Sequence, residues 1–484
     1  MGGSIPLSAI VINSQGWYNQ QDIKTRPWNL HLEQFAIQPG QKVLFRLINV
    51  GRSIPIMFGI EGHRMHVVST DGSPIIETMA DYLISFPGER FDFLIFGKSP
   101  KPSQQQYYMT AESLEHYDYF FQKISPTYAL ALLNYGSSAT IQRRKPDVQH
   151  RQCTVLSPCV VVNCLWPNFP PGYPYKCITM GQLQSLHNIQ SNALLPYYTG
   201  TNAQTFQEIY LNMHFDSHVN GWRFQYPQTL PYYHESNMSS ISVACNQNAC
   251  GPRGCWCFNY LKLGLNNVIQ LTVYNMGEGS GLPHGYAHPL HIHGMHFYVV
   301  KMAFGQYNQS TGMISANNPD FPCNYSVQCN NQRWSNPNWM NGNVPGMNLV
   351  NPPFKDTVTI PAGGYVVLRF VADNPGWWLA HCHILIHHLS GMAFVLKVGE
   401  NSQMMPPPPG FPLGCGNYDP KYPYQFPAKS TTPSSSTAQS QANTTTTSGP
   451  GSTSSKAQGY RNEFVGFLLP LLTAVAISHI FLVR

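Results

Sequence analysis

Residues 378–392, WLAHCHILIHHLSGM, place five side chains that bind soft metals within a short stretch: His381, Cys382, His383, His387 and Met392. In a β-strand alternate side chains share a face. The pattern therefore predicts that Cys382 points to one side of its sheet while His381 and His383 point to the other. Such a strand would carry ligands for two neighbouring sites, joined covalently through the peptide units beside the cysteine. His388 is expected to point away from the His387 site unless the segment becomes helical.

The composition favours a globular all-β protein. Of the 484 residues 43% are apolar and 13% aromatic, which fits a chain of several domains with cores of their own. Only 10% are charged, whereas Gly and Pro number 39 and 40, a balance that favours short strands joined by many turns. The net charge of +6 shows no cluster of Lys and Arg, so no nucleic-acid partner is expected.

Short alternating stretches bounded by Gly, Pro or Asp predict two β-sandwiches. QKVLFRLINV, HRMHVVSTDG, RFDFLIFG and YALALLNYG belong to the first, and NVIQLTVYN, HFYVVKMAF, DTVTIPAGGYVVLRFVAD and MAFVLKVG to the second. We expect the chain to be organised as a first sandwich at 1–140, a Cys/Pro-rich linker at 141–200, a second sandwich at 201–400, a Pro-rich extension at 401–430, a disordered Ser/Thr-rich stalk at 431–463 and a hydrophobic tail at 464–484.

The hydrophobic tail predicts attachment to the extracellular face of the plasma membrane. Residues 464–483, FVGFLLPLLTAVAISHIFLV, are about as long as a bilayer-spanning helix. Small residues near 452–455, a polar spacer and this tail match a glycolipid (GPI) anchor signal, which is removed from the mature protein. A single-pass transmembrane helix is the alternative. The anchor is favoured because the tail contains Pro470 and lacks a flanking basic cluster.

The cysteines and sequons favour a secreted, disulfide-bonded glycoprotein. The chain has 12 cysteines, most in tight groups, and sequons at Asn237, Asn308, Asn324 and Asn443. Setting Cys382 aside as a ligand leaves an odd number, so a partner in sequence beyond this chain is expected. The first residues, MGGSIPLSAIVINSQGW, contain no signal peptide, and we expect an N-terminally incomplete chain.

A second dense stretch supplies more histidines. Residues 283–300, PHGYAHPLHIHGMHFYVV, contain the candidate ligands His284, His288, His291, His293 and His296. On a strand His291 and His293 can face one cavity. One Cys, two His and a weak Met ligand favour copper in an electron-transfer site. A zinc cluster or satisfied polar residues are the weaker alternatives, because so many histidines beside a free cysteine have no packing role.

These two stretches resemble a known family. HPLHIHG and HCHILIHHLSGM resemble the two C-terminal copper motifs of the multicopper oxidases, which include laccases, ascorbate oxidase and ferroxidases. VLFRLINVG, EGHRMHVVSTDGSPI, ISFPGERFDFLI and NPPFKDTVTIPAGGYVVLRFVADNPGWWLAHCH resemble the second and third cupredoxin domains of animal laccase-like members, over roughly residues 8–400. The resemblance implies an all-β chain with two cupredoxin-like, Greek-key β-sandwich domains.

The resemblance also implies the copper ligands. It assigns a type 1 copper to His288, Cys382 and His387 with Met392 as axial ligand, a type 2 copper to His291, and a type 3 pair to His293, His381 and His383. In this family the type 1 copper takes electrons singly from a reducing substrate, and the trinuclear cluster reduces dioxygen to water. The family's two N-terminal motifs, H-W-H-G and H-x-H, do not occur in the chain, so half of the trinuclear ligands are missing.

The function implied is that of a membrane-anchored, extracellular, laccase-like oxidase of phenolic donors, with Cys382, His381 and His383 carrying the electrons. A ferroxidase is the alternative enzyme, and it would need acidic side chains beside His288 and His387 to bind ferrous iron. A blue-copper electron-transfer or copper-binding protein without oxidase activity is the third reading, because only the type 1 site is complete. The expected partners are a phenolic or metal-ion reductant and dioxygen.

Overall fold

The computed structural model describes residues 7–16, 32–101, 103–114, 127–136, 153–167, 174–188, 191–214, 217–251, 254–277, 287–310, 312, 314–323, 329–408, 411 and 476–483. The chain forms two compact units. One comprises Met1–Pro406, Leu413–Asn417 and Val475–Arg484, and the other comprises Pro407–Pro412 and Tyr418–Ala474. Every described strand and helix belongs to the first unit. The expected Ser/Thr-rich stalk lies outside the described residues, as does most of the Pro-rich extension.

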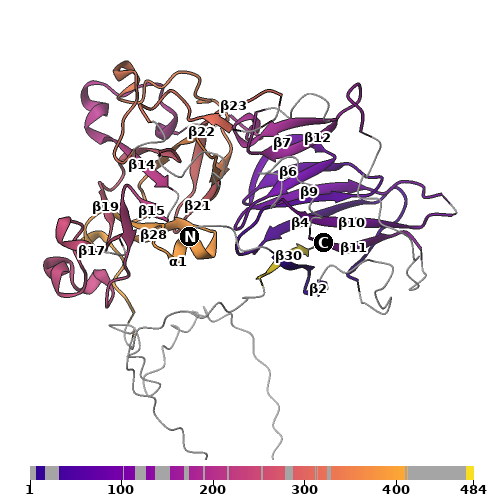
Figure 1. Ribbon diagram of the computed structural model, residues 1–484, viewed down its shortest axis with the longest axis horizontal. Helices are drawn as coiled ribbons and strands as arrows, with labels where there is room; N and C mark the ends of the chain where they lie inside the picture. The colour runs from indigo at the N-terminus through magenta and orange to yellow at the C-terminus, as the bar shows by residue number, and fades with distance from the viewer. Residues whose placement is uncertain are drawn as a thin grey trace, which may run out of the picture. The chain divides into compact units, whose positions relative to one another are not determined.

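The all-β prediction is confirmed. Two seven-stranded sheets form the first sandwich, and several of their strands are labelled in Figure 1. One has the order β2 (Gln15–Gly16), β1 (Leu7–Ile12), β30 (Ala476–Val483), β4 (Lys42–Asn49), β9 (Arg90–Phe96), β6 (Met65–Thr70) and β7 (Ser73–Ala80). The other has the order β13 (Tyr175–Thr179), β12 (Cys159–Cys164), β8 (Tyr82–Ser85), β5 (Ile56–Ile60), β10 (Gln106–Ser113), β11 (Tyr128–Asn134) and β3 (Gln34–Ala36).

The sequence of β4 shows why this layer forms. KVLFRLIN alternates exposed and buried positions, so Val43, Phe45 and Leu47 enter the core while the residues between them face outward. In the paired strand β9 the residues Phe91 and Phe93 are fully buried in the same core. Large apolar side chains at every second position therefore fix which face of the sheet points inward.

Two further sheets form the second sandwich. The nine-stranded sheet has the order β17 (Cys250–Gly251), β18 (Gly254–Cys257), β16 (Trp222–Phe224), β15 (His218–Val219), β14 (Phe206–His214), β20 (Val268–Tyr274), β27 (Tyr365–Val371), β22 (Phe297–Ala303) and β25 (Phe354–Lys355). The five-stranded sheet has the order β19 (Tyr260–Leu263), β29 (Ala393–Val398), β28 (Gly376–Cys382), β21 (His288–Ile292) and β26 (Thr357–Ile360).

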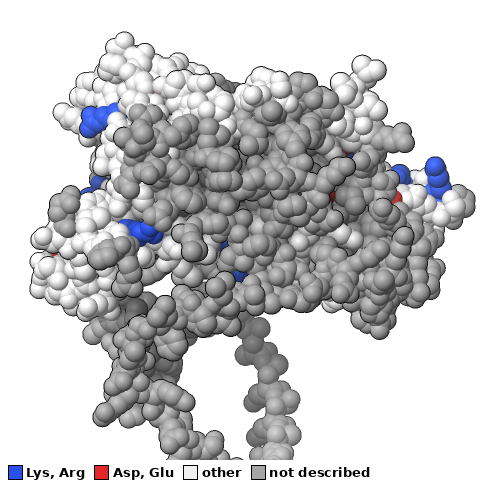
Figure 2. Space-filling view, in the orientation of Figure 1, with Lys and Arg blue, Asp and Glu red and all other residues white. Residues whose placement is uncertain are grey.

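The remaining elements are short. A two-stranded ribbon joins β23 (Gln306–Tyr307) to β24 (Ile314–Ala316), and α1 (Leu385–Leu389) is the one α-helix of the described residues. The 3-10 turns are η1 (Met180–Gln182), η2 (Asn192–Leu194), η3 (Gly200–Thr205), η4 (Pro231–Tyr233), η5 (Glu235–Ser240), η6 (Gln247–Ala249), η7 (Pro337–Trp339) and η8 (Asn401–Gln403). On the described part of the face shown in Figure 2, Lys and Arg side chains lie scattered.

Part of the expected linker is sheet. Strands β12 and β13 pair with each other in parallel, and β12 also pairs with β8, so both extend the first sandwich. A disulfide between Cys164 and Cys177 ties them together. The short run CVVVNC is apolar enough to be buried in a strand, although its two cysteines drew the sequence interpretation toward a linker.

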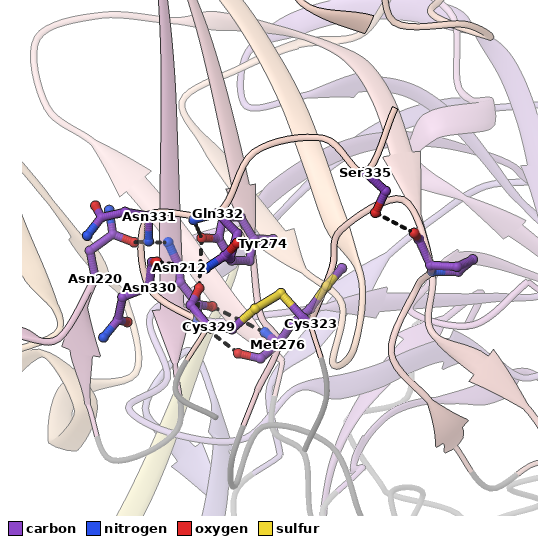
Figure 3. The surroundings of a disulfide bond; sticks show 11 residues. Asn212, Asn220, Tyr274, Met276, Cys323, Cys329, Asn330, Asn331, Gln332 and Ser335 are labelled. Atoms are coloured by element: carbon purple, nitrogen blue, oxygen red, sulfur yellow. Dashed lines mark hydrogen bonds between the residues drawn. A yellow bond between two sulfur atoms is a disulfide. The ribbon is translucent and has the colours of Figure 1, made fainter. Parts of the chain in front are cut away.

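The expected disulfides are present. The pairs are Cys153–Cys159, Cys164–Cys177, Cys245–Cys257, Cys250–Cys255 and Cys323–Cys329. Cys382 is the free cysteine of the described residues, and Cys415 lies outside them. Figure 3 shows how one pair is held: the hydroxyl of Tyr274 donates to the carbonyl of Cys329 at 2.9 Å, and the Asn212 amide donates to it at 3.4 Å. These bonds fix the disulfide to strands β14 and β20.

The hydrophobic tail differs from expectation over its described residues. In place of a helix, Ala476–Val483 form β30, which pairs in parallel with β1 and antiparallel with β4. Ile480 and Leu482 are buried whereas Phe481 is exposed, and the Asn13 amide bonds both the carbonyl and the N–H of Leu482. As a strand, this segment supplies hydrogen-bond partners to the backbone groups of both β1 and β4, which a helix there would leave unpaired. Among the described residues no helix is long and apolar enough to cross a membrane.

Candidate metal centre

Strand β28 brings the two dense stretches of ligands together. It lies between β29 and β21, and its register sets Cys382 opposite Leu290 and His381 opposite His291. The strand ends at Cys382, and α1 begins two residues after His383. The chain then folds back, because the N–H of Met392 donates to the carbonyl of His387 at 2.9 Å and the N–H of Cys382 donates to that of Met392 at 3.0 Å. The sulfur of Cys382 and the imidazole of His387, a residue of α1, thus lie close together at the end of β28.

A first group of ligands surrounds the thiol. The Sγ of Cys382 lies 3.7 Å from Nδ1 of His387 and 3.9 Å from Nδ1 of His288, and these two nitrogens are 3.2 Å apart. All three residues are buried, and their donor atoms lie within 4.8 Å of one another, close enough to share one ion. Met392 is fully buried in the same core as Cys382.

The chemistry of this group fits copper. Burial raises the pKa of the Cys382 thiol, so the thiolate needs a bound cation to be stable. One thiolate and two imidazoles, with a buried thioether nearby in sequence, form the donor set that favours copper in an electron-transfer geometry.

A second group of histidines lies on the other side of β28. The Nε2 atoms of His293 and His381 are 3.3 Å apart. The ring centroids of His291 and His293 are 4.9 Å apart, and those of His381 and His383 are 5.7 Å apart. The structure therefore places Cys382 in one group and its two neighbours in the other, as strand alternation predicts. Their roles as copper ligands stay a prediction.

Burial favours the neutral form of the histidines in this second group. It lowers the pKa of His381 to about 3 and also lowers the pKa of His293 and of His383. All three rings are therefore neutral near pH 7, the form in which imidazole binds a metal. Nδ1 of His381 lies 2.9 Å from the carbonyl of Cys382, and Nδ1 of His291 lies 3.0 Å from that of Asp356. A proton donated there would leave the Nε2 of each ring as the nitrogen with a lone pair for a metal.

Three other histidines of the two stretches have different places. His284 lies outside the described residues. His296 stacks on Phe354 with centroids 5.2 Å apart. His388 belongs to α1, so the segment is helical where the sequence left that possibility open. Its ring stacks on that of His381 at 4.2 Å, and its Nε2 lies 2.6 Å from the hydroxyl of Tyr226.

The sequence is similar to known proteins over most of its length. One model of the family described as multicopper oxidase matches residues 2–138, and a second of the same description matches residues 225–402. Laccase-7 of Oryza sativa subsp. japonica is 24% identical, over 77% of this chain and 60% of its own length. Laccase-12 of Arabidopsis thaliana is 25% identical, over 78% of this chain and 62% of its own length.

A solved structure has the same fold. The laccase from Botrytis aclada is 18% identical, covers 80% of this chain with 57% of its own, and superposes with a TM-score of 0.50. The chain spans about three fifths of the length of the curated relatives it matches.

Proposed function

Because this chain belongs to the multicopper oxidase family, we propose that it is a copper-dependent oxidoreductase of laccase-like type, which oxidises phenolic donors with dioxygen as the acceptor. The observation that carries the proposal is the arrangement around β28. A buried thiol with two imidazoles lies on one side, and the imidazoles of its sequence neighbours lie on the other. This arrangement suits electron transfer from one site to the next over two peptide units.

Each ligand has a proposed role. Cys382, His288 and His387 would hold the type 1 copper together with Met392, His291 would hold the type 2 copper, and His293, His381 and His383 would hold part of the type 3 pair. Copper bound there would supply one-electron chemistry at the first site and reduction of dioxygen at the second. The protein's own part is to keep Cys382 away from water and to join its thiolate covalently to His381 and His383.

The test compares donors and metal content. Copper-loaded protein is assayed for dioxygen consumption with a diphenol and, separately, with ferrous iron. Turnover of the diphenol is the expected result, whereas turnover of ferrous iron alone would favour a ferroxidase. Binding of a single blue copper without dioxygen consumption would favour an electron-transfer protein, and inertness toward both donors would count against either oxidase.

We also propose that the protein is an extracellular glycoprotein held at the plasma membrane by a glycolipid that replaces its C-terminal tail. Five disulfides support an oxidising compartment. The exposed Asn237 supports glycosylation, since the hydroxyl of Ser239 in its sequon donates to its side-chain oxygen at 2.9 Å. A glycolipid signal would be removed together with β30. Release of the protein by a phosphatidylinositol-specific phospholipase is therefore expected, and a mature protein that retains residues 476–483 would contradict the glycolipid anchor.

A further inference from the structure

The first sandwich presses a loop against the histidine group of the second. Gly88 lies between β8 and β9 with a φ of +87°, and a Cβ there would lie 2.5 Å from the ring of His383. Glycine is therefore required by both the backbone conformation and the contact. The same loop continues into Arg90, whose guanidinium donates to the carbonyl of Gly88 at 2.9 Å. The loop thus places the guanidinium of Arg90 beside the histidine group.

That cation is paired with the residue that supports His291. The two terminal nitrogens of Arg90 donate to the two carboxylate oxygens of Asp356, both at 2.6 Å. The carboxylate of Asp356 also accepts from the hydroxyl of Thr357 at 2.8 Å and lies 3.5 Å from Nδ1 of His291.

A second carboxylate locks the same arrangement from behind. Asp71, at the turn after β6, accepts from the N–H of Arg90 at 3.0 Å and from the N–H of Thr357 at 3.1 Å. It also pairs with Lys355 at 3.1 Å, and both side chains are fully buried. Residues 355, 356 and 357 are thus each bonded to the first sandwich, and they lead into β26, the neighbour of the strand that carries His291.

We propose that Arg90 is a positioning residue for the metal held by His291. A bidentate guanidinium fixes both the place and the plane of a carboxylate. Through Asp356 it fixes the main-chain carbonyl and the carboxylate that face Nδ1 of His291, and with them the direction of Nε2. The proposal rests on the proposed function, since it takes His291 to be a copper ligand. On this proposal the first sandwich sets the geometry of a site whose described histidines all belong to the second sandwich.

The test follows copper rather than turnover. Full-length chains carrying Arg90→Met or Arg90→Lys are titrated with copper, and the non-blue copper is observed by electron paramagnetic resonance. Arg46→Met is the matched control, because it removes an arginine paired with Asp92 on the same sheet, where the Arg46 side chain is 60% exposed. The blue absorption of the Cys382 site serves as the internal reference.

We expect Arg90→Met to weaken non-blue copper binding by about 10–100-fold and to change its hyperfine splitting, while the blue site and the control stay as in the wild type. Arg90→Lys should give an affinity between those of the wild type and Arg90→Met, because lysine keeps the positive charge but lacks the two parallel N–H donors of the guanidinium. A wild-type spectrum and affinity in Arg90→Met would overturn the proposal, as would an equal loss at both sites. If Arg90→Met does not fold, Asp356→Asn must show the same spectral change, and an unchanged spectrum there overturns the proposal.

Failure of the proposed function looks different. In that case the wild-type chain itself would bind no blue copper, or no non-blue copper, before any variant is compared.

Discussion

Glu89 should make the protein less stable as the pH rises from 4.5 to about 7. Its side chain is fully buried, and its carboxylate accepts from the N–H of Phe86 at 3.0 Å and from the amide of Asn163 at 2.7 Å. Burial raises the pKa of Glu89 from 4.5 to about 7, although the nearby Lys355 opposes that shift. The folded protein therefore holds a proton that the unfolded chain releases above pH 4.5.

The direction and size of the change in the free energy of unfolding follow from this difference in bound protons. Between pH 4.5 and about 7 the folded state binds more protons, so the free energy of unfolding falls as the pH rises and becomes level above about 7. A pKa difference of this size corresponds to about 3 kcal/mol. Glu89→Gln keeps the shape and a hydrogen-bond acceptor but cannot ionise. Its stability relative to the wild type should therefore increase by about 3 kcal/mol between pH 4.5 and pH 8.

Urea denaturation at a series of pH values, at matched copper content, measures this difference. Asp373→Asn, which removes an exposed carboxylate, is the control and should show no such trend. A difference between Glu89→Gln and the wild type that stays level across the series would refute the reasoning.

Three further outcomes are expected. Lys355→Met should lower the free energy of unfolding by about 3–5 kcal/mol, because it removes the buried ammonium 3.1 Å from Asp71 and leaves Arg90, at 3.6 Å, to balance that buried carboxylate; a loss under about 1 kcal/mol would argue against the buried pair. In the chain that keeps residues 476–483, Leu482→Ala should lower the free energy of unfolding by about 2–5 kcal/mol, whereas the exposed neighbour Phe481→Ala should cost far less; equal effects would speak against β30. Met392→Leu should raise the reduction potential of the blue copper in a redox titration, and an unchanged potential would remove Met392 as its axial ligand.

The alternation of the sequence predicted much of the fold and the division of the ligands. Phe45 and Phe93 lie inward at every second position, and the same rule separates Cys382 from His381 and His383. Local periodicity is a property of neighbouring residues, so a single sequence can display it.

The features that sequence reasoning missed depend on distant or marginal contacts. Arg90 and Asp356 are separated by 266 positions, and no local pattern pairs them. Because α1 is helical, the side chain of His388 does not follow the alternation of a strand, and its ring stacks on that of His381. The residue type of His388 alone does not predict this contact. The apolar tail was ambiguous because a run such as AISHIFLV suits a strand as well as a helix.

We propose above all that the buried Cys382 holds a copper ion together with His288 and His387. Copper-loaded wild type and Cys382→Ser should be compared by visible absorption and copper content. We expect an intense blue band in the wild type, and its complete loss with one fewer copper per chain in the variant. A blue band that survives in Cys382→Ser would contradict the assignment of this site.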